Sequence, residues 1–305
     1  MTKGSANHNV AGTAYALGAY LMWGFFPVFW KALGHVPALE ILFQRVIWSA
    51  LFLAGMVTLT RAWRQVRAIL RTPRQMALLA ATTALIGVNW LLFIWAVNAD
   101  RVLETSLGYF INPLVNVVLG VLFLGERLRR WQTLAVLLAA AGVLNLTAAT
   151  GVPPWIALTL AVTFGLYGLL RKISPVEPLV GLLVETGIMM PVALAYVLWL
   201  QATGTGSFGL DWGTDALLIL GGAVTMAPMI MFNAAARRLR YATLGVLQYL
   251  APSLHFILAV QLYGEPLTAA HLVTFACIWT GVALFAGDAV RAGRSRRLSR
   301  AVSGE

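Results

Sequence analysis

The sequence has little charge, one cysteine and four histidines, and each shortage excludes a class of site or fold. Only 11% of the 305 residues are charged and 60% are hydrophobic, whereas about a quarter of the residues are charged in a soluble globular domain. With Cys277 as the single cysteine, one chain can form neither a disulfide nor a thiolate metal cluster. No two histidines have ligand spacing on one helix, so we expect neither a metal nor another cofactor.

Catalytic constellations are also missing from the sequence. It has no Ser-Lys, Ser-His-Asp, His-Glu-x-x-His or nucleotide-binding glycine motif, which argues against intramembrane hydrolysis and against ATP-driven pumping. We therefore expect that the protein is not an enzyme. Two alternatives stay open: an intramembrane enzyme acting on lipid or isoprenoid with Glu185 and His255 as acid and base, and a membrane sensor or scaffold that transports nothing.

The chain consists mainly of apolar runs of about 20 residues, the length that a helix needs to cross a bilayer core of about 30 Å. Backbone groups in lipid must satisfy their own hydrogen bonds, so the predicted fold class is an all-α polytopic membrane protein. No cleavage site follows the first run, and we interpret it as an uncleaved helix. The ten predicted transmembrane helices cover residues 11–32, 39–60, 76–98, 103–124, 131–149, 154–170, 179–200, 214–236, 242–263 and 269–287.

The distribution of basic residues predicts the orientation of these spans. If both termini are cytoplasmic, all of the 22 basic residues except Lys31, Arg45 and Arg101 fall in inner segments. Because Lys and Arg collect in inner loops, we expect a multi-pass protein of the plasma (inner) membrane with cytoplasmic N- and C-termini. The arginines are dispersed over five loops and a tail, which is typical of topology signals that meet anionic lipid and not of a face that binds nucleic acid.

An internal repeat divides the chain into two halves of five spans. A shift of 139 positions superimposes Pro113 on Pro252, and a shift of 141 superimposes Gly24 on Gly165. Because five is an odd number, the second half must enter the membrane from the opposite side, which is the geometry of alternating access. The predicted units are a cytoplasmic N-terminus (1–10), a first repeat (11–149), a second repeat (154–287) and a basic cytoplasmic tail (288–305), which we expect to be disordered.

Long polar-containing strings in both halves resemble one transporter family. The first half contains YALGAYLMWGFFPVFWK, VPALEILFQRVIWS and NWLLFIWAVNADRVLETSLGYFINPLVNVVLGVLFLGERLRR, and the second contains TFGLYGLLRK, EPLVGLLVET and LQYLAPSLHFILAVQLYGEPL. These strings resemble the RarD type of EamA transporter, in the drug/metabolite transporter superfamily. The resemblance implies two EamA repeats of five helices each (TM1–5 and TM6–10). It also implies a secondary transporter, in our interpretation an exporter of small metabolites or drugs.

Two ionisable side chains lie within predicted spans, Arg45 and Glu185. Such a charge costs on the order of a few kcal/mol in lipid and by default marks a functional position with a partner. We predict that the two charges make gate contacts near opposite mouths. The alternative is that Arg45 snorkels and Glu185 forms a static pair. The expected partners are Glu40 or Glu104 for Arg45, and Arg171 or Lys172 for Glu185.

Amides and aromatic residues in the spans form a second set. Asn112 and Asn116 are four residues apart and share a helix face, which we expect to look at the pseudo-symmetry axis. The set either lines a central cavity, in which a substrate stacks on rings and bonds to amides, or holds helices together. His255 is also a candidate for proton uptake. The cavity candidates are Trp23, Asn89, Trp90, Tyr109, Asn112, Asn116, Tyr167, Gln248, Tyr249 and His255.

Matched prolines and matched Gly-Glu pairs complete the candidate residues. Pro113 and Pro252 each remove a helix hydrogen bond, so we predict two kinks that act as hinges. We expect Glu126 and Glu265 to anchor their spans at opposite membrane interfaces. The implied partners are an amphipathic or aromatic small-molecule substrate and the lipid bilayer. The sequence leaves the oligomeric state open, with a homodimer as one form that it allows.

Overall fold

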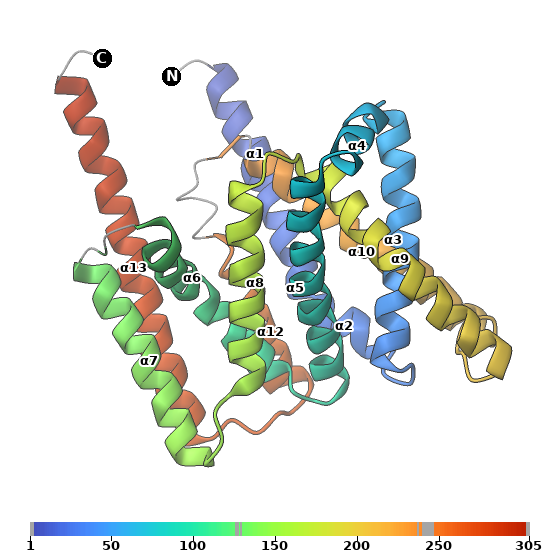
Figure 1. Cartoon of the computed structure of the whole chain (residues 1–305). Helices are drawn as coiled ribbons and strands as arrows, with labels where there is room; N and C mark the ends of the chain where they lie inside the picture. The colour runs from blue at the N-terminus through green and yellow to red at the C-terminus, as the bar shows by residue number, and fades with distance from the viewer. Residues whose placement is uncertain (1–2, 126–127, 129, 237, 240–246, 303–305) are drawn as a thin grey trace.

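A computed structural model describes residues 3–125, 128, 130–236, 238–239 and 247–302, and within them the secondary structure is helical throughout (Figure 1). The helices are α1 (Lys3–Gly24), α2 (Phe26–Lys31), α3 (Ala38–Leu59), α4 (Trp63–Leu70), α5 (Pro73–Asn98), α6 (Val102–Leu124), α7 (Arg130–Thr150), α8 (Trp155–Ile173), α9 (Pro178–Thr203), α10 (Trp212–Ala236), α12 (Leu250–Ile257), the π-helix η1 (Leu258–Leu262) and α13 (Ala269–Val302).

The described helices confirm the predicted class of all-α polytopic membrane protein. Eight of them are long and apolar enough to cross a membrane, namely α3, α5, α6, α7, α8, α9, α10 and α13. The first predicted span is divided between α1 and α2. The described part of the ninth is the short apolar segment Leu250–Leu262, and its beginning lies outside the described residues. The count of ten spans therefore stays a prediction.

A proline causes the division of the first span. Pro27 has no backbone N–H, so the carbonyl of Trp23, four residues earlier, has no partner within the helix. The imidazole of His255 lies against this carbonyl, with Nε2 3.0 Å from the Trp23 oxygen. The imidazole of His255, in the second half, thus donates a hydrogen bond to the Trp23 carbonyl, which Pro27 leaves without a helix donor in the first half.

Contacts between helices run across the two halves. α3 packs against α9, α6 against α12 and α7 against α13, and each pair joins a span to its predicted counterpart 139 to 141 positions later. The other large contacts match one another through the repeat. The contact of α1 with α12 corresponds to that of α8 with α6, and the contact of α1 with α10 corresponds to that of α8 with α5. The contact of α3 with α10 corresponds to that of α9 with α5. The beginning of α1, the end of α13 and α4 lie at one end of the bundle (Figure 1).

Small residues allow a close contact between α7 and α13. A Cβ added at Gly281 would lie 2.9 Å from the carbonyl oxygen of Ala135, and one added at Gly142 would lie 3.1 Å from that of Thr274. Lipid tails are as apolar as leucine, so helices in a membrane associate through such close packing and not through exclusion of water. The two glycines are 139 positions apart, so both halves use the same device at this interface.

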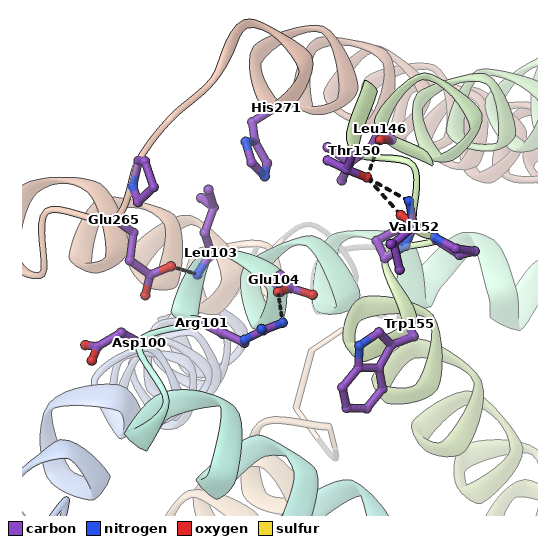
Figure 2. Close-up of a pocket in the computed structure, with 13 residues that line it drawn as sticks. Asp100, Arg101, Leu103, Glu104, Leu146, Thr150, Val152, Trp155, Glu265 and His271 are labelled. Carbon is purple, nitrogen blue, oxygen red and sulfur yellow. Dashed lines mark hydrogen bonds and ion pairs between the residues drawn. The ribbon is translucent and has the colours of Figure 1, made fainter. Parts of the chain in front are cut away.

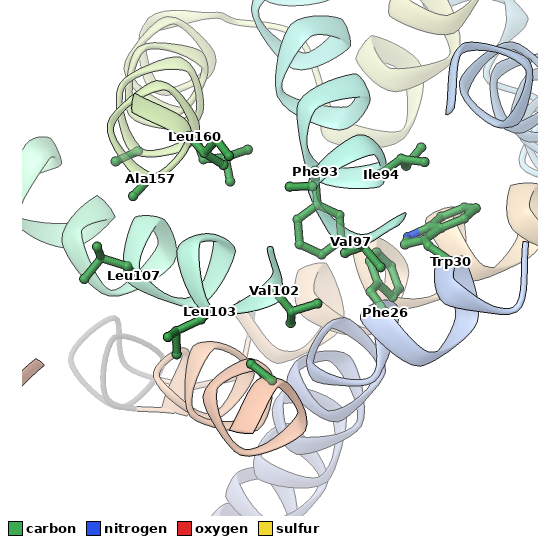
Figure 3. Packing of buried hydrophobic residues seen from close by; sticks show 14 of the residues in the cluster. Phe26, Trp30, Phe93, Ile94, Val97, Val102, Leu103, Leu107, Ala157 and Leu160 are labelled. Carbon is green, nitrogen blue, oxygen red and sulfur yellow. The ribbon is translucent and has the colours of Figure 1, made fainter. Parts of the chain in front are cut away.

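The largest apolar cluster lies where α2, α5, α6 and α8 meet (Figure 3). Trp30 on α2 is fully buried, and its ring centroid lies 6.1 Å from that of Phe26 and 4.8 Å from that of Phe29. Phe93 and Val97 of α5 belong to the same cluster. This packing fixes the broken first span against the third.

Two segments differ from the predictions. Residues 63–70, expected as part of a loop, form α4, whose Val66 and Ile69 are buried while Arg64 and Arg67 are exposed. The prediction of a disordered tail is wrong, because α13 continues to Val302. The sequence of residues 288–302 contains no proline and is rich in arginine and alanine, which favour helix.

Candidate functional site

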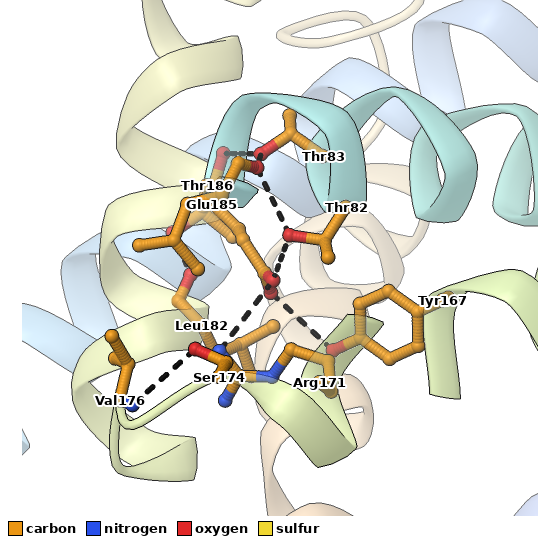
Figure 4. Close-up of polar contacts among 10 residues, drawn as sticks. Thr82, Thr83, Tyr167, Arg171, Ser174, Val176, Leu182, Glu185 and Thr186 are labelled. Atoms are coloured by element: carbon orange, nitrogen blue, oxygen red, sulfur yellow. Dashed lines mark hydrogen bonds and ion pairs between the residues drawn. The ribbon is translucent and has the colours of Figure 1, made fainter. Parts of the chain in front are cut away.

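Glu185 on α9 is the centre of a buried polar cluster between α5, α8 and α9 (Figure 4). Its side chain is 1% exposed. Thr82 donates its hydroxyl proton to Oε1 at 2.6 Å, and the phenol of Tyr167 donates to Oε2 at 3.3 Å. A carboxylate removed from water needs such donors, since it gains no compensation from the lipid. The cluster therefore holds an anion deep in the bundle.

Arg171 is the cationic partner of this anion. Its Nη1 lies 3.8 Å from Oε1 of Glu185, which is an ion pair, but Nη1 makes no hydrogen bond among the described residues. Gly181 makes room for the guanidinium, since a Cβ there would lie 2.1 Å from Nη1. Of the two partners expected for Glu185, the structure brings Arg171 to it. The side chain of Lys172 is exposed.

Arg45 on α3 is 3% exposed and is held quite differently. Its Nε donates to the hydroxyl of Thr225 at 2.6 Å. Its Cζ lies 4.0 Å from the ring centroid of Trp90 and 5.1 Å from that of Trp30. Aromatic faces attract a cation through their quadrupole, so the two tryptophans replace part of the lost hydration.

The expectation that Arg45 reaches Glu40 or Glu104 is wrong. Both oxygens of Glu40 accept bonds from Ser207, from its N–H at 2.8 Å and from its hydroxyl at 3.0 Å. Glu104 pairs with Arg101, whose Nη1 lies 3.1 Å from Oε1. The step of five residues from position 40 to position 45 turns a helix by a net angle of about 140°, so the side chains of Glu40 and Arg45 point to different sides of α3. Snorkelling is also excluded in this structure, because Arg45 is enclosed by aromatic rings.

The two buried charges occupy matching positions in the two halves. Position 185 follows position 45 by 140, within the shifts of 139 and 141 that align the repeats. Each charge lies on the second span of its half and bonds at 2.6 Å to a buried threonine on the third span of the other half. The arrangement repeats the position, the burial and the hydroxyl partner, and it reverses the sign of the charge.

The amides on α5 and α6 bind α8. Asn89 donates through Nδ2 to the carbonyl of Leu160 at 3.0 Å, and Asn112 donates to that of Ala161 at 3.0 Å. Asn116 donates to Oδ1 of Asn112 at 3.2 Å, so the two do share a face. This face lies against α8, however, and not against α12, the counterpart of α6. Small residues of α8 let the amides come within hydrogen-bond distance of its backbone.

Aromatic candidates gather around His255. The His255 ring lies 5.5 Å from that of Phe93 and 5.8 Å from that of Tyr109, measured between centroids. The phenol of Tyr109 lies 3.4 Å from Oδ1 of Asn89. Since a carbonyl only accepts, the bond to Trp23 places a proton on Nε2 of His255. These residues join α5, α6 and α12 at the centre of the bundle.

The remaining cavity candidates do not form one group. Trp23 packs on Tyr20, with centroids 5.6 Å apart, and Tyr249 stacks on Phe110 at 6.2 Å. Gln248 is half-buried in the turn before α12. Tyr167, predicted for the cavity, instead belongs to the cluster around Glu185 (Figure 4).

The two candidate hinges differ in their local structure. Pro113 lies inside α6, whereas Pro252 lies in the first turn of α12, where a helix needs no N–H. Ser106 of α6 donates its hydroxyl to the carbonyl of Pro252 at 2.8 Å and so links the two helices. The segment on which a kink at Pro252 would depend includes residues 240–246, which lie outside the described residues.

A pocket of about 360 Å³ is lined by residues at the start of α6, the end of α7 and the start of α8 (Figure 2). Arg101, Glu104, Trp155 and His271 are among its lining residues. Glu265, expected as an interfacial anchor, is 8% exposed there, and its oxygens accept the N–H groups of Val102 and Leu103 at 2.6 and 2.8 Å. These orphan donors at the start of α6 bind the carboxylate, so Glu265 links the segment after η1 to α6, and its place at the membrane interface stays a prediction. Its predicted counterpart, Glu126, lies outside the described residues.

Sequence reasoning missed the residues that complete these sites. Thr82, Thr225 and Trp30 hold the buried charges, but threonine and tryptophan are unremarkable in an apolar chain. The internal repeat could have indicated Thr82 and Thr225, since each lies on the third span of its half and faces the second span of the other half. Among the described residues, no three His, Cys, Asp or Glu side chains converge as metal ligands would.

The fold and these sites define a polytopic helical membrane protein with buried charges between its two halves, and known proteins supply its family. The EamA-like transporter family model matches residues 10–148. The chain is 48% identical to an uncharacterized transporter of Vibrio cholerae, over 95% of this chain and 96% of that protein. It is 49% identical to Protein RarD of Escherichia coli K12, over 92% and 95%, and 33% identical to the chloramphenicol-sensitive protein RarD of Pseudomonas aeruginosa, over 92% and 95%.

The chain therefore belongs to the EamA-like transporter family, in its RarD type, within the drug/metabolite transporter superfamily. A solved crystal structure that is 20% identical covers 90% of this chain and 97% of its own, with a TM-score of 0.59. That likeness supports the fold. The protein is a multi-pass membrane transporter.

Proposed function

We propose that this protein is a secondary transporter that exports small metabolites or drugs by alternating access. The cavity lies between two inverted five-helix repeats, residues 11–149 and 154–287. The protein lies in the plasma (inner) membrane with both termini in the cytoplasm. Its partners are the bilayer and a small-molecule substrate with an aromatic or amphipathic body.

The matched helix contacts are the observation that carries this proposal. Each of the main helix–helix contacts is of one of two kinds. Either it joins a helix to its counterpart in the other half, or the counterparts of its two helices make an equivalent contact. An inverted repeat built this way has two related conformations, because the set of contacts closed at one face can be exchanged for the equivalent set at the other. Such an exchange exposes a central site to one compartment at a time.

The cluster around Glu185 is the inner gate in this proposal. It lies near the start of α9 and the end of α8, beside the arginine-rich inner segments. The ion pair with Arg171 is long enough, at 3.8 Å, to break without loss of a direct hydrogen bond. Opening would separate α8 from α9 and leave Glu185 with its bond from Thr82. Among the described residues Arg45 has no matching ion pair, so we assign it a role other than that of a gate.

The enzymatic alternative gains no support from the sites. Glu185 bonds to Thr82, Tyr167 and Arg171, whereas His255 bonds to the Trp23 carbonyl and lies among aromatic rings. An acid and a base that act on one substrate must both reach it within hydrogen-bond distance. These two residues belong to separate clusters.

Flux measurements test the proposal directly. Purified full-length protein in proteoliposomes should move labelled small metabolites across the bilayer, and a proton gradient should change the rate if protons are coupled. Empty liposomes are the control. A sensor or scaffold moves nothing, and an enzyme converts its substrate without moving it. The absence of flux across a broad metabolite panel would contradict the proposal.

A further inference from the structure

Arg45 is a buried cation without a counter-ion in the part of the chain that the structure describes. The ion pairs found there are Lys31 with Asp100, Arg101 with Glu104, and Arg171 with Glu185. The only hydrogen bond of Arg45 among the described residues uses Nε. Burial of an unpaired charge is costly, and buried charges are normally paired. The terminal nitrogens of this guanidinium are thus available to an anion.

The surroundings of Arg45 have the composition of a ligand site. Trp90, at 4.0 Å, is half-buried, so its ring is partly accessible. Tyr109 is also half-buried. Phe93 lies one helical turn after Trp90 on α5, and its ring is 5.7 Å from that of Tyr109. Phe93 itself is buried, so the rings that are partly accessible near the charge are those of Trp90 and Tyr109.

We infer that Arg45 binds the carboxylate of an anionic substrate whose flat, aromatic or otherwise apolar body packs on Trp90 and Tyr109. The inference rests on the proposed transport function and names its substrate class. A guanidinium presents two parallel N–H groups that match a carboxylate. One buried positive charge is neutralised by one monoanion, whereas a dianion would leave an uncompensated negative charge in the bundle.

The structure of the second half supports this assignment. At the matching position, Glu185 has Arg171 as its built-in partner. The protein can therefore supply a counter-ion at this position in the repeat, and at Arg45 it supplies aromatic faces and a hydroxyl instead. A site that is completed only when an anion arrives selects for that anion.

Matched pairs of ligands that differ only in charge test the inference. Full-length protein in lipid nanodiscs is titrated with benzoate and benzamide, with phenylacetate and phenylacetamide, and with cinnamate and cinnamamide, at pH 7. Binding is read from thermal stabilisation and from quenching of tryptophan fluorescence. We expect at least one carboxylate to bind about tenfold or more tightly than its amide, since a charge-assisted hydrogen bond is worth about 1.5–3 kcal/mol.

Variants of Arg45 identify the group responsible. Arg45→Gln should abolish the preference for the carboxylate, and Arg45→Lys should keep part of it, because the charge stays and the paired N–H geometry is lost. Arg74→Gln removes an exposed charge at the start of α5 and should change nothing. The Lys variant keeps the test valid if the Gln variant does not fold.

Two results would overturn the inference: a wild-type protein that prefers no carboxylate over its amide, and an Arg45→Gln variant that folds and keeps the preference. Flux of neutral solutes in the same proteoliposomes would then leave the transport proposal standing and remove only the substrate class. Lack of flux for every solute, together with carboxylate binding at Arg45, would instead contradict transport and keep the anion site.

Discussion

Arg45 and Glu185 occupy matching places in the two halves, yet their surroundings differ. Both are at most 3% exposed, and both bond at 2.6 Å to a threonine on a neighbouring span. Glu185 has a cation and a phenol as further partners, whereas Arg45 has two tryptophan faces. The repeat therefore preserves where a charge lies and leaves its chemistry free to change. At this position the second half has an ion pair, whereas the first half has a cation without a counter-ion among the described residues.

Removal of the charge of Glu185 should have the largest effect. Glu185→Gln keeps an acceptor for Thr82 and leaves Arg171 without a counter-ion, which we expect to lower stability by about 3 kcal/mol. Transport should fall at least tenfold if the pair is a gate. Unfolding in mixed micelles and flux in proteoliposomes measure the two effects. Unchanged transport in a well-expressed variant would make the pair a static structural feature.

Crowding of Arg171 tests the same pair without touching either charge. In Gly181→Ala, the new Cβ would lie 2.1 Å from Nη1 of Arg171, so the guanidinium must move away from Glu185. A flexible side chain moves at little cost in itself, so we expect a loss of at most about 2 kcal/mol, which comes from weakening of the buried ion pair. Gly187→Ala on the same helix is the control, because no atom lies within 4 Å of its Cβ. Equal stability of the two variants in the same unfolding assay would argue against a tightly held Arg171.

Loss of an aromatic face tests the other member of the comparison. Trp90→Leu keeps the apolar volume only in part and removes the ring that lies 4.0 Å from Arg45. A desolvated cation–π contact contributes about 1–2 kcal/mol, so we expect thermal stability to fall by about that amount. Trp212→Leu, at a position that is 80% exposed, should be nearly neutral. A Trp90→Leu variant as stable as the wild type would mean that Arg45 has another partner.

Glu265 extends the comparison to a buried charge held by backbone alone, and its effect should be the smallest. Burial raises its pKa above the usual 4.5, although two backbone N–H groups favour the carboxylate. A raised pKa means that the folded state binds this proton more tightly, so the contribution of Glu265 to stability is fully present below pH 4.5 and is lost as pH rises through the folded pKa.

The variant Glu265→Gln should remove that pH dependence and change stability at pH 7 by less than about 1 kcal/mol, the usual scale of a helix cap. Thermal unfolding between pH 4.5 and 7 measures the slope. Glu177→Gln, which changes an exposed carboxylate, should leave it unaltered. An unchanged slope in Glu265→Gln would show that this carboxylate is not the group that titrates.

Most of the architecture could be predicted because hydropathy and basic loops act through the bilayer, a constraint that every span experiences. Helix α9, for example, begins at Pro178 and ends at Thr203, close to the predicted 179–200. The extra helix α4 escaped prediction because it is short, and its apolar residues Val66 and Ile69 alternate with arginines. The long α13 escaped because basic residues looked like solvated tail, whereas they are also good helix formers.

The sites could be predicted only in part. The unusual residues Arg45 and Glu185 were visible because charge is rare in the spans, but their partners depend on how helices rotate about their axes. That rotation decides that Asn112 meets the Ala161 carbonyl and that Glu265 meets the start of α6. In a helix that is apolar on every side, hydropathy does not show which face points into the bundle, so such contacts could not be predicted from it.

The break at Pro27 couples two distant residues of the chain. Its ring leaves the Trp23 carbonyl without a helix donor, and the imidazole of His255 supplies one. If an alanine at position 27 restored the missing amide, the Trp23 carbonyl would no longer need the hydrogen bond from His255. The double variant Pro27→Ala, His255→Phe should then be less damaging than the sum of the single changes. A lineage that drifted away from the proline would be free to lose the histidine as well.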